Sequence, residues 1–133
     1  MFSIFKRKTK QVNPFEQGWL TGMIDIHCHL LPAVDDGSKS IEETLSLIDL
    51  LEEIGVKQHI LTPHIMEEYP SNDAIFLRAR FEELLAAITP DKASRLRLAA
   101  EYMLDAAFLD RLAEPLLTLG DRHILVETSY MAP

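Results

Sequence analysis

Histidine and glutamate residues recur in this 133-residue chain where stretches of apolar sequence end. His27 and His29 follow one such stretch, His64 closes a second, and Glu101 and Glu127 close a third and a fourth. Imidazole and carboxylate groups without thiolates suit Mn²⁺, Fe or Zn²⁺ and are poor ligands for soft metals. A single residue of this kind would indicate nothing, but the recurrence at successive stretches predicts a metal site.

His27 and His29 are two residues apart, and this spacing has a geometric consequence. On an extended strand, residues two apart face the same way and are separated by about 6.6 Å, so two imidazoles can converge on one ion. An isolated His-x-His pair is more often a chance or surface feature, and Asp35-Asp36-Gly37 taken alone predicts a turn. The prediction of a metal site therefore depends on the joint arrangement.

Strand and helix patterns alternate along the chain and must position these residues. Short apolar or alternating stretches predict four strands, over residues 23–27, 56–62, 95–101 and 123–127. Helical spacing predicts three helices, over residues 41–54, 72–88 and 106–117. This alternation predicts an α/β fold with a parallel sheet, either open or closed as a barrel. The carboxyl ends of such strands are where sites assemble, because the following loop leaves the residue exposed.

Two of the predicted helices carry recognisable capping residues. Ser40 and Glu43 fit a capping box at the start of the first helix, and Gly55 stands where a C-cap glycine belongs. Either Asn72 or Asp73 can cap the second helix. The expected inner face of that helix consists of Ile75, Leu77, Phe81, Leu84 and Leu85.

The composition favours one soluble globular domain, with 47% hydrophobic and 26% charged residues. No stretch approaches the ~18 apolar residues of a membrane span, and no apolar segment of a secretory signal follows the basic N-terminus. The lone cysteine, Cys28, excludes an internal disulfide and indicates a reducing, cytoplasmic compartment. Cysteine-phosphatase chemistry is excluded as well, because Val34 stands where that mechanism requires arginine. We expect Cys28 to be a buried apolar residue.

The formal net charge of −8 is unevenly distributed. Four of the 13 basic residues are concentrated near the N-terminus, namely Lys6, Arg7, Lys8 and Lys10. The remainder of the chain is strongly acidic. An acidic body repels nucleic acid, so no nucleic-acid partner is expected. The basic segment allows at most a peripheral membrane contact, and a solubilising tail is the simpler interpretation.

Residues 23–37 resemble the opening motif of the polymerase-and-histidinol-phosphatase (PHP) superfamily, and most closely its bacterial capsule-type protein tyrosine phosphatases. Residues 62–64, 101–102 and 125–127 resemble the second, third and fourth motifs of these proteins. The resemblance implies that residues 22–133 are the N-terminal part of a distorted (β/α)7 barrel of the PHP type, with about four βα units. Residues 1–21 then form a basic, irregular lead-in.

The resemblance also implies a ligand set for up to three ions, usually Mn²⁺, with Fe, Zn²⁺ or Mg²⁺ as alternatives. His27 and His29 would hold the first ion, and Asp36 and His64 would belong to another. Glu101 would bridge two ions and Glu127 would be a further ligand, so that a metal-bound hydroxide attacks the phosphate.

Two acidic neighbours of these residues have supporting roles in this interpretation. Asp35 is expected beside the ions without binding them, and the choice of Asp36 over Asp35 follows the family pattern. Asp25 is a candidate hydrogen-bond partner for one ligand imidazole.

The function implied by the resemblance is hydrolysis of phosphotyrosine, with a bacterial tyrosine kinase of capsule or exopolysaccharide synthesis as the partner. One alternative is another PHP phosphoesterase, of the histidinol-phosphate type. The other is a non-catalytic interaction module that retains the metal residues as relics.

Superfamily members continue with a further His motif, a late Asp-x-His and phosphate-binding arginines, none of which occurs before Pro133. The chain is therefore interpreted as the N-terminal half of a longer protein. On this interpretation, we expect it to have little phosphatase activity alone and to self-associate through an exposed sheet edge. His59 and His123 are expected to be structural residues within strands.

Overall fold

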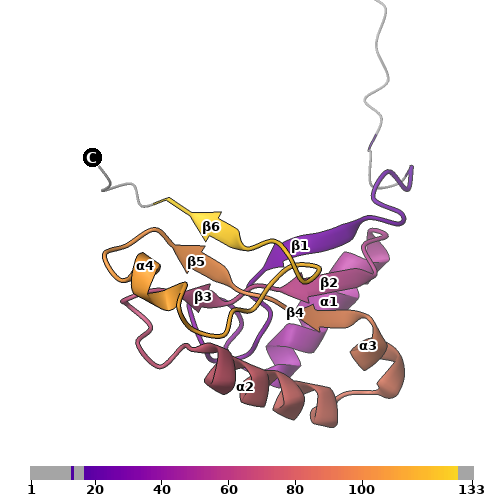
Figure 1. Ribbon diagram of the computed structural model, residues 1–133. Helices are drawn as coiled ribbons and strands as arrows, with labels where there is room; N and C mark the ends of the chain where they lie inside the picture. Colours follow the sequence, from indigo (N-terminus) through magenta and orange to yellow (C-terminus); the bar gives the residue numbers. More distant parts are fainter. Residues whose placement is uncertain (1–12, 14–16, 129–133) are drawn as a thin grey trace, which may run out of the picture.

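The computed structural model describes residue 13 and residues 17–128, and these contain two three-stranded parallel sheets (Figure 1). One sheet has the order β1-β2-β4, with bounds Ile24–Cys28, Gln58–Leu61 and Leu96–Leu98. The other has the order β3-β5-β6, with bounds His64–Ile65, Glu101–Met103 and Leu125–Glu127. The predicted α/β class with parallel pairing is confirmed, whereas the described residues form no closed barrel. The basic residues of the N-terminal segment lie outside the described part of the chain.

Four helices connect the strands: α1 (Ile41–Glu53), α2 (Ala74–Ala87), α3 (Pro90–Ser94) and α4 (Phe108–Arg111). Figure 1 shows α2 beneath the strands, α1 behind β2 and β4, and α4 beside β5. None of the described helices is long and apolar enough to cross a bilayer. Helices and strands enclose one hydrophobic cluster, whose buried members include Leu31, Ile48, Leu61, Leu77, Leu84, Leu96 and Leu117.

Two of the predicted strands are each interrupted in the structure. The stretch 56–62 becomes β2 and, after Thr62 and Pro63, β3; the stretch 95–101 becomes β4 and, after two alanines, β5. Backbone hydrogen bonds cross both interruptions, from Ala99 N to Leu61 O (2.9 Å) and from Glu101 N to Pro63 O (3.0 Å). The two chain segments therefore stay side by side, although each bends between its two strands.

Other predicted elements differ from the observed ones in their extent. Helix 106–117 is reduced to the single turn of α4, and the buried Leu117 N–H beyond it donates to the Tyr102 hydroxyl (2.8 Å). Pro115 has no N–H to continue a helix there. The strand expected from residue 123 begins at Leu125, which leaves His123 exposed and outside the strand. Ile75 is 78% exposed, so its assignment to the inner face of α2 is wrong.

The helix caps agree with the sequence prediction, except that the Glu43 carboxylate has a different hydrogen-bond partner. The Ser40 hydroxyl accepts from Glu43 N, but the Glu43 carboxylate accepts from Lys39 N (2.6 Å) rather than from the Ser40 N–H. Asp73 is the N-cap of α2, where its carboxylate accepts from the third residue of the helix. Asn72 is therefore free for a different role, described below.

His59 lies fully buried in β2, as expected for a structural residue. Neither of its ring nitrogens has a hydrogen-bond partner among the described residues, and Asp25 Oδ2 is 3.9 Å from Nδ1. Burial lowers the pKa of His59, although the charges of Asp25 and Glu52 act in the opposite direction. The imidazole is therefore neutral in the folded chain at neutral pH.

The buried neutral His59 predicts that acid destabilises the fold. The unfolded chain takes up a proton at this residue near pH ~6.5, and the folded chain does so only at lower pH. The free energy of unfolding should therefore fall as pH drops from about 6.5 towards the folded pKa, with no contribution from His59 above that window. Urea unfolding between pH 5 and pH 8 should show a weaker pH dependence in His59→Leu. The control His123→Leu, at an exposed site, should keep the wild-type dependence of the unfolding free energy on pH. An equal pH dependence in all three proteins would contradict the assignment of His59 as a buried neutral residue.

Candidate metal centre

The strand register brings the predicted residues to one region of the molecule. In the parallel pairing of β3 and β5, His64 lies opposite Glu101, and in that of β5 and β6, Met103 lies opposite Glu127. His64 and Glu101 begin their strands rather than ending them, because both strands are interrupted just before these residues. His27 lies near the end of β1.

Three imidazoles converge on one carboxylate oxygen. Oε2 of Glu101 lies 3.0 Å from Nε2 of His27, 3.2 Å from Nε2 of His29 and 3.5 Å from Nδ1 of His64. The Glu101 side chain is only 5% exposed. Oε2 of Glu127 lies 3.7 Å from the same His64 nitrogen. The atoms that could bind cations therefore face one another across a small space.

Three overlapping groups have the geometry of a metal site, with ligand atoms within 4.8 Å of one another. They are His27, His29 and Glu101; His29, Asp36 and His64; and His64, Glu101 and Glu127. All six residues proposed from the sequence are members, and the described part of the chain contains no further group of this kind. Because residues are shared between the groups, the arrangement has the form of a centre for more than one ion.

Asp35 and Asp36 have different environments. The buried Asp35 carboxylate accepts from Gly37 N (2.9 Å) and His64 N (3.0 Å), and its Oδ2 is 2.9 Å from His29 Nδ1. Burial acts to raise the pKa of Asp35, but these hydrogen bonds outweigh it and lower that pKa. Asp36 is 69% exposed, and its Oδ1 lies 3.6 Å from His64 Nε2 and 3.8 Å from His29 Nδ1. Asp35 therefore orients the His29 ring and holds the His64 backbone, whereas the carboxylate oxygens of Asp36 stay available to bind a cation.

The hydrogen bond to Asp35 acts on His29 in turn. It raises the pKa of His29 and favours the tautomer with the proton on Nδ1, so the Nε2 lone pair faces Glu101. The suggestion that Asp25 supports a ligand ring is not borne out. Its Oδ1 accepts from the backbone N–H of His27 (3.1 Å), and its Oδ2 lies 3.9 Å from Nδ1 of His59, which is not a candidate ligand.

Cys28 takes no part in this arrangement. Its thiol donates to Ile60 O (3.5 Å) and packs against the hydrophobic cluster. Burial, together with the negative charge of Asp25, raises the pKa of Cys28 far above its ordinary value. The thiol is therefore not a nucleophile.

Two residues that hold the site in place were not predicted from the sequence. Gly37 lies so close to His29 that an added Cβ would be 2.1 Å from His29 O. Asn72 is buried, and its amide donates to Val34 O (3.0 Å) and His64 O (2.8 Å). The Asp-Gly turn sequence could have indicated the first residue, but no local pattern distinguishes Asn72 from a helix cap.

Tyr69 was also missed, in a polar loop without periodicity. Its ring is nearly parallel to that of His64, with 7° between the planes and 5.9 Å between the centroids. Burial and the nearby charges of Asp36 and Asp35 raise the pKa of Tyr69, so its hydroxyl remains protonated.

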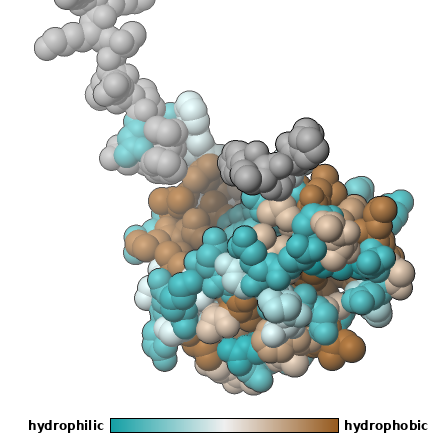
Figure 2. Space-filling model, turned by 90° about the vertical axis from the view of Figure 1, so that its left-hand side faces the viewer, coloured by the Kyte–Doolittle hydropathy of each residue, from teal (hydrophilic) through white to brown (hydrophobic). Residues whose placement is uncertain are grey.

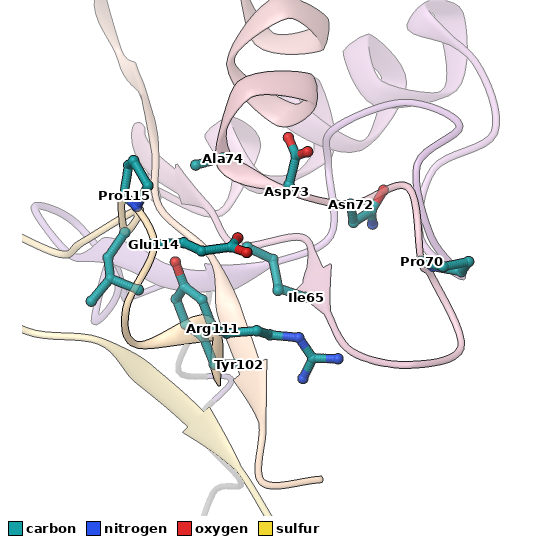
Figure 3. A pocket seen from close by; sticks show the side chains of 10 residues that line it. Ile65, Pro70, Asn72, Asp73, Ala74, Tyr102, Arg111, Glu114 and Pro115 are labelled. Atoms are coloured by element: carbon teal, nitrogen blue, oxygen red, sulfur yellow. The ribbon is translucent and has the colours of Figure 1, made fainter. Parts of the chain in front are cut away.

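A separate cavity of about 240 Å³ lies behind this loop (Figure 3). Its walls include Ile65 of β3, Tyr102 of β5 and the start of α2. Arg111 on its border is paired with Asp105, at 2.5 Å between Nη1 and Oδ1. None of the six candidate ligands lines this cavity, so it is distinct from the candidate metal centre.

The buried amide of Asn72 should contribute measurably to stability. Asn72→Ala leaves two backbone carbonyls without their partner, which should lower the free energy of unfolding by about 1–3 kcal/mol. Ser71→Ala, at the exposed neighbouring position, is the matched control and should change it by less than ~0.5 kcal/mol. Urea denaturation followed by circular dichroism measures both, and equal stabilities of the two variants would contradict the role of the amide.

The chain is similar to proteins named as tyrosine-protein phosphatases. The family model for capsular polysaccharide synthesis proteins CpsB/CapC matches residues 23–133. The tyrosine-protein phosphatase YwqE of Bacillus subtilis is 28% identical over 116 residues, which are 81% of this chain and 44% of YwqE. The tyrosine-protein phosphatase CpsB of Streptococcus agalactiae is 50% identical over 42 residues, covering 32% of this chain and 17% of CpsB.

A solved structure agrees with these matches. It is one of the crystal structures of YwqE from Bacillus subtilis and CpsB from Streptococcus pneumoniae, which are unique metal-dependent tyrosine phosphatases. It superposes with a TM-score of 0.69 at 28% identity, over 84% of this chain and 47% of the matched chain. The chain therefore spans less than half the length of these relatives.

Proposed function

Because the chain belongs to the CpsB/CapC family of capsular polysaccharide synthesis, we propose that it supplies the metal centre of a protein tyrosine phosphatase. One observation carries the proposal: a nearly buried carboxylate, Glu101, faces a nitrogen of each of three histidines within 3.5 Å. The relatives named as tyrosine-protein phosphatases support the same reaction.

The residues of the candidate centre fit divalent cations. Nδ1 of His64 is buried and has no hydrogen-bond partner among the described residues, although it faces Glu101 and Glu127. A buried nitrogen of this kind costs free energy unless something binds it, and a cation would do so. An imidazole and carboxylate donor set suits Mn²⁺, Fe or Zn²⁺, with Mn²⁺ the ion we propose.

We assign the ligands as the sequence suggested, for up to three ions. His27 and His29 would hold one ion, Asp36 and His64 another, and Glu101 and Glu127 would complete the set. Bound ions would supply Lewis acidity, which neutralises a phosphate monoester and acidifies a bound water. They also reverse the local charge, which lets an acidic protein accept an anionic substrate.

The residues of the chain contribute orientation. Asp35 holds His29 with its Nε2 lone pair towards Glu101, and the same carboxylate binds the backbone N–H of His64. One buried group thus holds the ring of His29 and the backbone of His64 before any ligand arrives. Such outer partners tune both ring orientation and ligand basicity.

The proposed substrate is a phosphotyrosine protein, in particular a bacterial tyrosine kinase of capsule or exopolysaccharide synthesis. Phosphotyrosine is a phosphate monoester, the class that the candidate centre is suited to bind. The family assignment to capsular polysaccharide synthesis supports a partner from that process, and the proposal includes a cytoplasmic location.

The fold that we propose is the N-terminal part of a distorted (β/α)7 barrel, formed by residues 22–133. In the described part, β1 has one hydrogen-bonded neighbour, β2, and β6 has one, β5. β1 exposes Ile24 (49%) and Ile26 (53%) beside an apolar cavity of about 340 Å³. Figure 2 shows hydrophobic residues at the surface in the upper left of its view. Such an edge invites pairing with another strand.

Self-association of residues 1–133 is the expected consequence of the open edge. Multi-angle light scattering should show a mass above 15.1 kDa that rises with concentration. Ile26→Lys places a charge on this edge and should shift the chain towards the monomer. Leu109→Lys is the control, because Leu109 is exposed on α4, away from β1. A monomer at every concentration would contradict this proposal.

The phosphatase proposal is tested on the full-length protein that contains this chain. Glu101→Gln removes the shared carboxylate charge, so Mn²⁺ affinity should fall by at least about 10- to 100-fold in isothermal titration calorimetry. Hydrolysis of a phosphotyrosine peptide should be lost with it. Glu53→Gln, an exposed position on α1, is the matched control and should behave like the wild type.

The outcomes separate the alternatives. Faster turnover of the phosphotyrosine peptide than of histidinol phosphate supports the proposal, and the reverse order indicates a different phosphoesterase. Protein that binds no metal and hydrolyses neither compound is a non-catalytic module, which would overturn the proposal.

A further inference from the structure

The loop between β3 and α2 presents an aromatic ring at the edge of the candidate metal centre. The ring of Tyr69 is offset from that of His64 and nearly parallel to it, which is a favourable stacking geometry. Among the described residues, Tyr69 is the one aromatic residue other than histidine whose ring is in contact with a candidate ligand.

This loop is held at both of its ends. Glu67 N donates to Asp105 Oδ2 (2.9 Å) at one end, and the Asn72 amide donates to His64 O (2.8 Å) at the other. Between them, Tyr69 O accepts from Asn72 N (2.9 Å). These hydrogen bonds hold the loop, and the stack on His64 holds the ring, so a ligand can contact the ring without a large ordering cost.

A cavity of about 300 Å³ adjoins the ring. Tyr69 and Phe76 provide aromatic surface in its lining, and Ala33 and Val34 provide aliphatic surface. None of the six candidate ligands lines this cavity, but Tyr69 in its lining stacks on His64, and Val34 directly precedes Asp35 and Asp36 in the chain. The cavity therefore lies beside a residue that contacts the candidate metal centre.

We propose that Tyr69 and this cavity determine specificity for aryl phosphates, by packing against the phenyl ring of phosphotyrosine. The inference rests on the proposed phosphatase function, and it assigns the selectivity to residues outside the ligand set. Cations bind a phosphate group whichever alcohol carries it, so they cannot distinguish tyrosine from an aliphatic alcohol. A fixed aromatic wall beside the cations can do so, because ring stacking is available only to an aryl ester.

Two non-hydrolysable probes test the inference on the full-length, Mn²⁺-loaded protein. Calorimetry gives the dissociation constants of phenylphosphonate and methylphosphonate for the wild type, Tyr69→Phe and Tyr69→Leu. The wild type and Tyr69→Phe should favour phenylphosphonate equally. Tyr69→Leu keeps the apolar bulk and should bind phenylphosphonate about 2- to 10-fold more weakly, with unchanged affinity for methylphosphonate. Leu109→Ala on α4 is the control and should match the wild type.

The remaining outcomes overturn either this inference or the phosphatase proposal on which it rests. If both probes bind and Tyr69→Leu leaves their ratio unchanged, Tyr69 does not determine specificity, and the phosphatase proposal stands. If Tyr69→Leu weakens both probes equally and lowers Mn²⁺ occupancy, Tyr69 only supports His64, which also overturns the inference. If neither probe binds the metal-loaded wild type, the phosphatase proposal itself fails.

Discussion

The nearly buried carboxylate of Glu101 is the constraint around which the other residues of the candidate centre are arranged. A buried carboxylate is costly unless cations or hydrogen bonds compensate its charge. Here its neighbours are imidazoles, which compensate it only when they carry protons or when a cation lies between them and the carboxylate. Packing alone gives no reason for such a cluster, whereas a metal centre requires it.

The hydrogen bonds that position the cluster are separate from the groups that would bind ions. Asp35 connects the end of β1, the turn at Gly37 and the start of β3, and Asn72 connects the same loop to the strand. These groups leave the facing atoms of Glu101 and His64 available. The chain can therefore build the site in folding, and the cations can enter a geometry that already exists.

Sequence patterns identified the candidate ligands, which the structure brings together, better than they identified the supporting residues. His27 and His29 were found because a strand has a period of two, and His64 and Glu101 because they follow apolar stretches. The interruptions before His64 and Glu101 were missed, since short apolar runs do not reveal where a strand bends. Asn72 and Tyr69 act through contacts with distant segments, and no local pattern encodes those contacts. The brevity of α4 likewise reflects the pairing of Leu117 with Tyr102.

On the proposed function, affinity and selectivity for a phosphate ester would be carried by different parts of this fold. His64, Glu101 and Glu127 would supply charge-binding groups, and their positions follow from the parallel register of β3, β5 and β6. The 66–72 loop supplies aromatic surface, whose position follows from its anchors at Asp105 and Asn72. A change in the loop sequence can thus alter which ester is accepted and leave the ligand set intact. A change in the strand register cannot leave the ligand set intact, because it separates His64 from Glu101 and removes the site itself.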